Sequence, residues 1–117
     1  MNGGVIEITG GSVTATGGCE LEDGVQSDSF GGAGIGGGDN GGVTSVTITG
    51  GRVLARAIGA AAGIGGGNDG PVGVRLDAET VEPGSIAIGG TADVTAFGGS
   101  HALGTRDGGA GIGAGCG

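Results

Sequence analysis

The sequence predicts an all-β protein, a short right-handed parallel β-solenoid of about three coils with three inserted loops. The first observation behind this prediction is an internal repeat. A strand-like phrase reads IEITGGSVTAT at residues 6–16, VTITGGRVLAR at 46–56 and, with one residue inserted, IAIGGTADVTAF at 86–97. The second is a glycine-rich phrase after each copy: GAGIGGG at 32–38, AAGIGGG at 61–67 and GAGIGAG at 109–115. The third is the alternation of apolar and polar residues in the first phrase, which is typical of strands.

The spacing of equivalent residues defines the repeating unit and its insertions. Ile8, Ile48 and Ile88 lie 40 residues apart, but the distances inside the three copies differ. A minimal unit of about 29 residues fits all copies once three insertions are set aside. We place the insertions near residues 19–30, 71–84 and 100–108. The chain is then one glycine-rich repeat module, residues 1–117, with repeats at about 2–40, 41–70 and 71–117.

Alternation along each strand assigns side chains to the two faces of the sheet. Ile6 and Ile8 should point inward and Glu7 outward, because side chains alternate with period two. The glycine pairs after Thr9 and Thr49 should turn a corner. Stacking the copies predicts four inward columns: Ile8/Ile48/Ile88, Val13/Val53/Val94, Ala15/Ala55/Ala96 and Ile35/Ile64/Ile112.

Composition narrows the fold class. The chain has 36 glycines among 117 residues, two Phe, and no Trp or Tyr, so its core cannot be thick. Helices are nearly excluded, because glycine costs about 1 kcal/mol per helical position relative to alanine. So much glycine is also typical of low-complexity chains, against which the repeat and the alternation argue. A bundle of polyproline II helices is the alternative fold, but it does not explain the strand-like phrases.

Charge limits the partners. Twelve acidic residues oppose four basic ones, and the net charge of −8 repels phosphate backbones and anionic membranes. We therefore expect no nucleic-acid partner, and no membrane insertion because no apolar run approaches the roughly 18 residues of a span. Both ends of the chain fall at the same phase of the repeat, so we expect a module of a longer protein. The end coils would expose unpaired strand edges, where we expect self-association or neighbouring repeats.

Phrases of the form ITGGxVxA followed by GAGIGGG resemble the glycine-rich repeats of large secreted and surface proteins of gut and other Gram-positive bacteria. The resemblance covers nearly the whole chain except the three insertions, and the third copy departs from it at residues 89–92. Such repeats commonly sit beside adhesin-like or carbohydrate-binding domains. The resemblance thus implies an extracellular or cell-surface location and carries no catalytic signature.

The residues that could carry chemistry lie mainly in the insertions. His101 is the only histidine, and nothing in the spacing of Ser100 and Asp107 around it supports a catalytic triad. The acidic cluster of the first insertion is explained by the solubility of an exposed loop, so we expect no enzyme activity. Loops on repeat scaffolds often carry recognition, and we expect ligand binding there instead. The expected binding residues are Glu20, Glu22, Asp23, Asp28, Phe30, Asp77, Glu79, His101, Arg106 and Asp107.

Calcium is the one cofactor that the sequence suggests. The run IGGGNDGPV at residues 64–72 approaches a nonapeptide calcium-binding repeat, but it occurs once. Asp39, Asn40, Asn68 and Asp69 follow the glycine phrases at equivalent places and offer oxygen ligands. Asn and Asp also favour turns, which is the preferred interpretation, with calcium as the alternative.

The two cysteines leave a disulfide undecided. Cys19 belongs to the first repeat and Cys116 to the end of the third. Two strand spacings separate those coils by about 9–10 Å, which exceeds the usual Cα separation of a disulfide. The first insertion could close that gap.

We favour the function of a non-catalytic binding or adhesion module, which recognises a glycan or a surface partner through its loops. Phe30 and Phe97 are the only aromatic residues available to stack on sugar rings. Ice binding is an alternative, because outward Thr-x-Thr pairs occur at Thr14/Thr16 and Thr47/Thr49, but Arg56 should interrupt a flat row. A passive spacer or assembly element is the second alternative.

Overall fold

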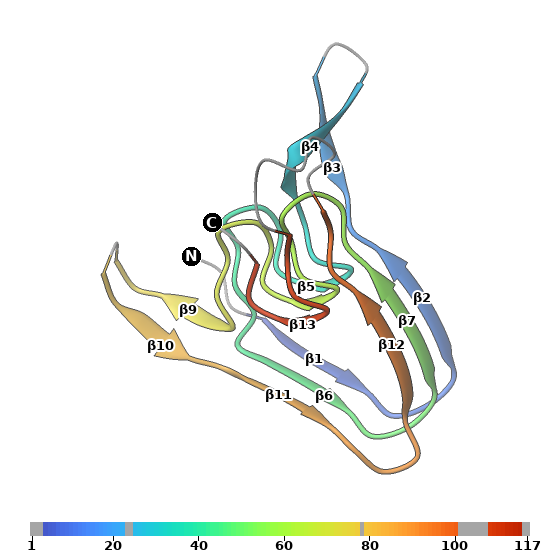
Figure 1. Ribbon diagram of the computed structural model, residues 1–117. Coiled ribbons are helices and arrows are strands. Elements are labelled where there is room, and N and C mark those ends of the chain that lie inside the picture. The colour runs from blue at the N-terminus through green and yellow to red at the C-terminus, as the bar shows by residue number, and fades with distance from the viewer. Residues whose placement is uncertain (1–3, 23–24, 78, 101–107, 116–117) are drawn as a thin grey trace.

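The computed structural model describes residues 4–22, 25–77, 79–100 and 108–115. Within these ranges the protein contains strands and turns but no helix (Figure 1). Nine strands form three parallel sheets of three strands each, and four more form two antiparallel hairpins. The sheets contain β1 (Val5–Ile8), β6 (Ser45–Ile48) and β11 (Ser85–Ile88); β2 (Ser12–Thr16), β7 (Arg52–Arg56) and β12 (Asp93–Phe97); and β5 (Ile35–Gly36), β8 (Ile64–Gly65) and β13 (Ile112–Gly113).

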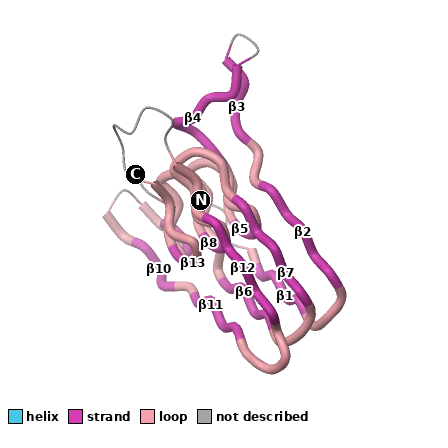
Figure 2. Tube along the Cα trace, turned by 45° about the vertical axis from the view of Figure 1, so that its right-hand side comes forward, coloured by secondary structure: helices cyan, strands magenta, loops and turns pink. Residues whose placement is uncertain are grey.

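The chain visits the three sheets in the same order three times. We name these visits the first pass (β1, β2, β5), the second pass (β6, β7, β8) and the third pass (β11, β12, β13). In every sheet the strand of the second pass lies between the other two. The passes therefore lie on one another as a stack, with parallel strands side by side (Figure 2). The prediction of an all-β protein with parallel strands is confirmed.

The strand register is the one that the repeat predicts. All four predicted columns are formed by directly paired residues in neighbouring passes: Ile8, Ile48 and Ile88; Val13, Val53 and Val94; Ala15, Ala55 and Ala96; and Ile35, Ile64 and Ile112. The reason is physical, since a shift by one residue would turn every apolar side chain of a strand to the opposite face.

Most of the core lies in the second pass, and Ile35 of the first pass is also buried. Ile48, Ile64 and Val53 are at most 1% exposed, because each has a neighbouring pass on both sides. The prediction that all members of a column point into the core holds less well at the third pass. There Ile88 is 40% exposed and Ile112 47% exposed, because no further pass covers them.

Glycine is required where neighbouring passes approach most closely. At Gly65 the backbone has a φ of 137°, which side chains of L-residues rarely allow. A Cβ atom at Gly65 would also lie 1.8 Å from the carbonyl oxygen of Gly113 in the next pass. The glycine-rich phrases are thus a condition of stacking, which explains why they recur with the strands.

The corner between the first two sheets absorbs the residue inserted in the third copy. Residues 9–11 and 49–51 turn this corner in the first two passes, and residues 89–92 turn it in the third. The longer turn closes with a bond from the Ala92 amide to the Gly89 carbonyl, 3.3 Å long. The strands on both sides therefore keep their register.

The first two insertions fold as antiparallel hairpins. The first consists of β3 (Cys19–Glu22) and β4 (Val25–Gly31), with an irregularity in the pairing between Cys19 and Leu21. The second consists of β9 (Gly73–Arg75) and β10 (Val81–Pro83). In the third, residues 101–107 lie outside the described part of the chain. The sequence predicts loops at these places, and two of them contain antiparallel strand pairs.

Candidate functional site

The first and third insertions begin at the same corner of the stack, which we call the insertion corner. It follows β2 in the first pass and β12 in the third (Figure 1). A backbone bond closes the base of each insertion, from the Gly32 amide to the Gly18 carbonyl at 2.9 Å and from Gly109 to Gly99 at 3.0 Å. In the second pass, residues 57–63 cross this corner with no insertion. The short second-pass link therefore lies between the bases of two insertions.

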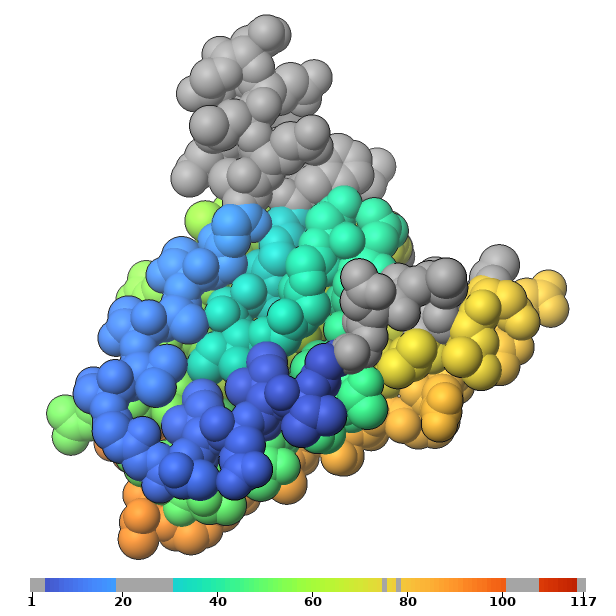
Figure 3. Space-filling view, turned by 180° about the vertical axis from the view of Figure 1, so that it is seen from behind, coloured from blue at the N-terminus to red at the C-terminus, as the bar shows by residue number. Residues whose placement is uncertain are grey.

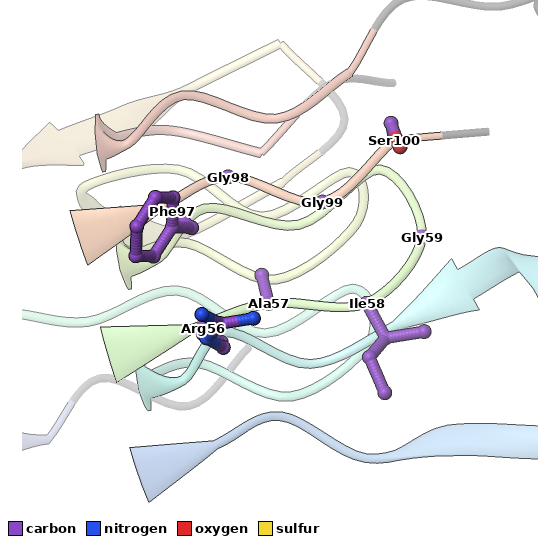
Figure 4. A pocket seen from close by; sticks show the side chains of 8 residues that line it. All are labelled: Arg56, Ala57, Ile58, Gly59, Phe97, Gly98, Gly99 and Ser100. Carbon is purple, nitrogen blue, oxygen red and sulfur yellow. The ribbon is translucent and has the colours of Figure 1, made fainter. Parts of the chain in front are cut away.

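A cavity of about 300 Å³ lies at the insertion corner. It is lined by residues 56–59 of the second pass and 97–100 of the third (Figure 4). Three of the lining residues are glycines, at 59, 98 and 99, so much of the wall is bare backbone. A wall without side chains leaves room for a small ligand to reach backbone groups.

Arg56 and Phe97 form the distinctive feature of this cavity. They end β7 and β12, and they are direct partners in the ladder, so both project from the outer face of the sheet. The guanidinium carbon of Arg56 lies 4.8 Å from the centre of the Phe97 ring, within the range of a cation–π contact. Phe97 is 47% exposed. Among the residues whose side chains the structure describes, which leaves out 19–30, no carboxylate forms an ion pair with Arg56.

The same outer face carries a second arginine that is already paired. Arg52 at the start of β7 lies 3.6 Å from a carboxylate oxygen of Asp93, and their side chains are 80% and 70% exposed. Arg52 and Arg56 are two of only four basic residues in a chain of net charge −8. β7 therefore bears a local concentration of positive charge, and its last residue, Arg56, lines the cavity.

The outward-facing residues of β2, β7 and β12 do not form continuous rows of threonine. Thr14, Leu54 and Thr95 form one row, and the next row runs from Thr16 through Arg56 to Phe97. Arg56 interrupts the threonine surface, as the sequence predicts.

The residues expected to bind ligand do not form one described cluster. Asp77 and Glu79 lie at the tip of the β9–β10 hairpin, which leaves the stack between β8 and β11, away from the insertion corner (Figure 1). The others belong to the two insertions at that corner. Glu20 and Glu22 lie in β3 and Asp28 and Phe30 in β4, whereas Asp23, His101, Arg106 and Asp107 lie outside the described residues.

Asp77 has a structural role in its turn. One of its carboxylate oxygens accepts bonds from the amides of Glu79 and Thr80, each 2.8 Å long. The bond from the Glu79 amide is the main cause that lowers the pKa of Asp77, and bonds from Thr80 add to it. This arrangement is an Asx-type turn at a hairpin tip.

The four residues considered for calcium lie in the turns that follow β5 and β8. Asp39 accepts bonds from the side-chain amides of Asn40 and Asn68, both 3.0 Å long. Asn40 and Asp69 have φ values of 56° and 54°, which Asn and Asp adopt more readily than other residues. These contacts match the turn interpretation. Among the described residues, no group of three or more His, Cys, Asp or Glu side chains could hold a metal ion.

The disulfide question lies outside the described structure. Cys19 begins β3, but Cys116 is not among the described residues. The sequence suggests Phe97 for stacking on a sugar ring and Arg56 as an interruption of the threonine rows, but it places neither residue in a site. The sequence signal that could have identified both residues is their position. Each is the last, outward-facing residue of its strand, and it precedes either an insertion (Phe97) or the short second-pass link at the same corner (Arg56).

Comparisons with protein-family models, curated proteins and solved structures gave no match for this chain. In the described part of the protein, no helix has the length and apolar character to cross a membrane.

Proposed function

We propose that this protein is a non-catalytic binding module of an extracellular or cell-surface bacterial protein, and that it holds a glycan or a similar polar surface group in the insertion-corner cavity. The scaffold would be a short right-handed parallel β-solenoid. Three passes through the same sheets in the same order, paired in register, support that architecture. The observation that carries the function is the exposed Phe97 ring beside the Arg56 guanidinium in a cavity of about 300 Å³.

The chemistry of the cavity suits a sugar ring. The apolar face of a sugar packs on an aromatic ring, as the exposed part of Phe97 would allow. Arg56 can donate several hydrogen bonds to hydroxyl or carboxylate oxygens, and Ser100 supplies a hydroxyl on the opposite wall (Figure 4). The lining contains no carboxylate or histidine among the described residues, so it offers no acid–base pair for hydrolysis.

The insertions would supply the rest of the site. The first and third insertions both begin at the insertion corner, and they bring acidic residues, Phe30, His101 and Arg106 in sequence. Ice binding is less well supported, because Arg56 and Phe97 project from the outer face where a flat threonine row would be needed.

The experiment is a glycan-array screen with and without calcium, followed by titration of the best ligand. We expect Phe97→Ala and Arg56→Gln each to weaken binding by about five- to thirtyfold, since each removes a contact worth roughly 1–2 kcal/mol. Arg52→Gln is the matched control on the same strand, because it removes only an exposed ion pair. Unchanged affinity in both cavity variants would refute the proposed site. A calcium requirement that persists after Asp39→Asn would place any metal elsewhere.

A further inference from the structure

We infer that copies of this chain stack head to tail, with the third pass of one copy lying on the first pass of the next. This inference is independent of the proposed ligand site. In each of the three sheets the end strands pair on one edge only, with the second pass, and their other edge has no strand partner in the described structure. Open parallel edges are templates for a further strand. The occupant that we commit to is a second copy of this chain.

The third-pass end exposes the apolar ends of the core columns. Ile88 and Ile112 are 40% and 47% exposed, whereas Ile48 and Ile64 in the same columns are fully buried. If the first pass of another copy lay on this end, its Ile8 would cover Ile88 and its Ile35 would cover Ile112. Burial of that surface would stabilise the contact by about 25 cal/mol per Å² of apolar area.

The first-pass end carries glycines that its own structure does not require. A Cβ atom at Gly67 would lie 1.9 Å from the carbonyl oxygen of Gly38 in the preceding pass, and one at Gly115 would lie 1.8 Å from that of Gly67. These glycines are therefore needed because a preceding pass lies against them. Gly38 is the first of the column, and a Cβ there would meet nothing within 4 Å. Its φ is not positive, so its own backbone does not demand glycine either.

A second column at another corner shows the same pattern. A Cβ atom at Gly50 would lie 2.6 Å from the carbonyl oxygen of Thr9, but one at Gly10 would meet nothing within 4 Å. Gly10 also lacks a positive φ. Both free positions belong to the first pass, whose face is turned to the viewer in Figure 3. A preceding pass supplied by another copy would give both glycines the function that Gly50 and Gly67 have inside the molecule.

Head-to-tail stacking is the arrangement that suits all three sheets. It continues the internal register, and on the outer face it would place Asp93 beside Ser12 and Phe97 beside Thr16, with no like charges opposed. A two-fold arrangement of two third-pass ends would reverse the order of the sheets around the core. At most one sheet could then meet its own counterpart. Head-to-tail contacts do not close, so the assembly should grow with concentration.

The test is the molar mass as a function of concentration, measured by sedimentation equilibrium on the full chain. We expect the mass to rise from the 10.6 kDa of one chain past that of a dimer without reaching a plateau. The double variant Gly10→Ala/Gly38→Ala should remain at 10.6 kDa at the concentrations where the parent associates. Its melting temperature at high dilution should be unchanged, because both new methyl groups occupy open space in the single chain.

The matched control is Gly89→Ala. Gly89 also has open space for a Cβ atom, but it takes the outward place that Thr9 and Thr49 have in the other passes. This variant should associate as the parent does. The inference is overturned if the parent stays monomeric, if its mass stops at a dimer, or if the double variant associates as strongly as the parent.

Discussion

Ile48 and Ile88 occupy the same column, yet one is fully buried and the other is 40% exposed. The difference comes from position in the stack, because Ile48 has a pass on each side and Ile88 has one. The sequence predicts the column, since alternation and repetition are visible in it. It does not predict the exposure, which depends on everything that covers each residue in the fold, since Ile35 in the other end pass is only 7% exposed. Chemically identical residues thus have unequal importance for stability.

This contrast gives a prediction at the scale of the residue. Ile48→Asp should unfold the protein, because it removes a buried side chain and places an unpaired carboxylate in the core, at a cost of about 4–5 kcal/mol or more. Such a cost approaches the whole stability of a small domain. Ile88→Asp should cost much less, since water reaches that position. Chemical denaturation followed by circular dichroism measures both, and equal losses would contradict the burial difference.

The insertions are the elements that sequence reasoning described least well. Their positions follow from repeat arithmetic, but their conformation does not, because residues 19–31 and 73–83 have no repeated partner that constrains them. The β9–β10 hairpin shows the consequence. Asp77, one of the expected ligand-binding residues, accepts hydrogen bonds from the amides of Glu79 and Thr80 and so holds the turn, which its position in the sequence does not reveal. The presence of an acidic residue in a loop can thus be explained by hydrogen bonds to neighbouring backbone amides.

The Asp77 turn gives a prediction at the scale of the element. Hydrogen bonds to the ionised carboxylate lower the pKa of Asp77, so they stabilise the turn above the unfolded pKa of aspartate. That stabilisation is lost as the pH falls through the lowered, folded pKa. The amide proton shifts of Glu79 and Thr80 should therefore move in an NMR titration at acidic pH, below the midpoint of an aspartate in a short peptide. Asp77→Ala should abolish the movement, and a midpoint above that of the peptide would contradict the turn.

At the scale of the whole molecule, the insertion corner illustrates what one sequence can and cannot reveal. The register of the stacked strands could be predicted from the sequence because it repeats, and Val13, Val53 and Val94 do pair as expected. The cavity could not be predicted from the sequence. It depends on the contact of Arg56 with Phe97 across two passes, and on a second-pass link that is shorter than its neighbours. The shared repeat pattern predicts the stacked strands, but it does not predict a cavity that arises where the three passes differ.

The sequence also offers a way to remove the insertions without disturbing the stack. Deleting residues 20–30 leaves Thr16 and Ile35 separated by as many residues as Arg56 and Ile64 in the second pass. Deleting residues 101–107 has the same effect between Phe97 and Ile112. Deleting residues 73–83 removes the β9–β10 hairpin and gives the second pass the same connection to β11 that joins the first pass to β6. This third deletion leaves the insertion corner unchanged.

The most direct test of the account is the affinity of these deletion variants for the ligand selected on the glycan array. Circular dichroism and thermal melting should first show that the stack remains folded in each variant. We then expect the combined deletion of residues 20–30 and 101–107 to weaken binding at least about tenfold, equivalent to roughly 1.4 kcal/mol. The deletion of residues 73–83 should leave the affinity unchanged. Full affinity in the folded corner deletion, or loss of binding in the hairpin deletion, would contradict the claim that the two insertions at this corner contribute to recognition.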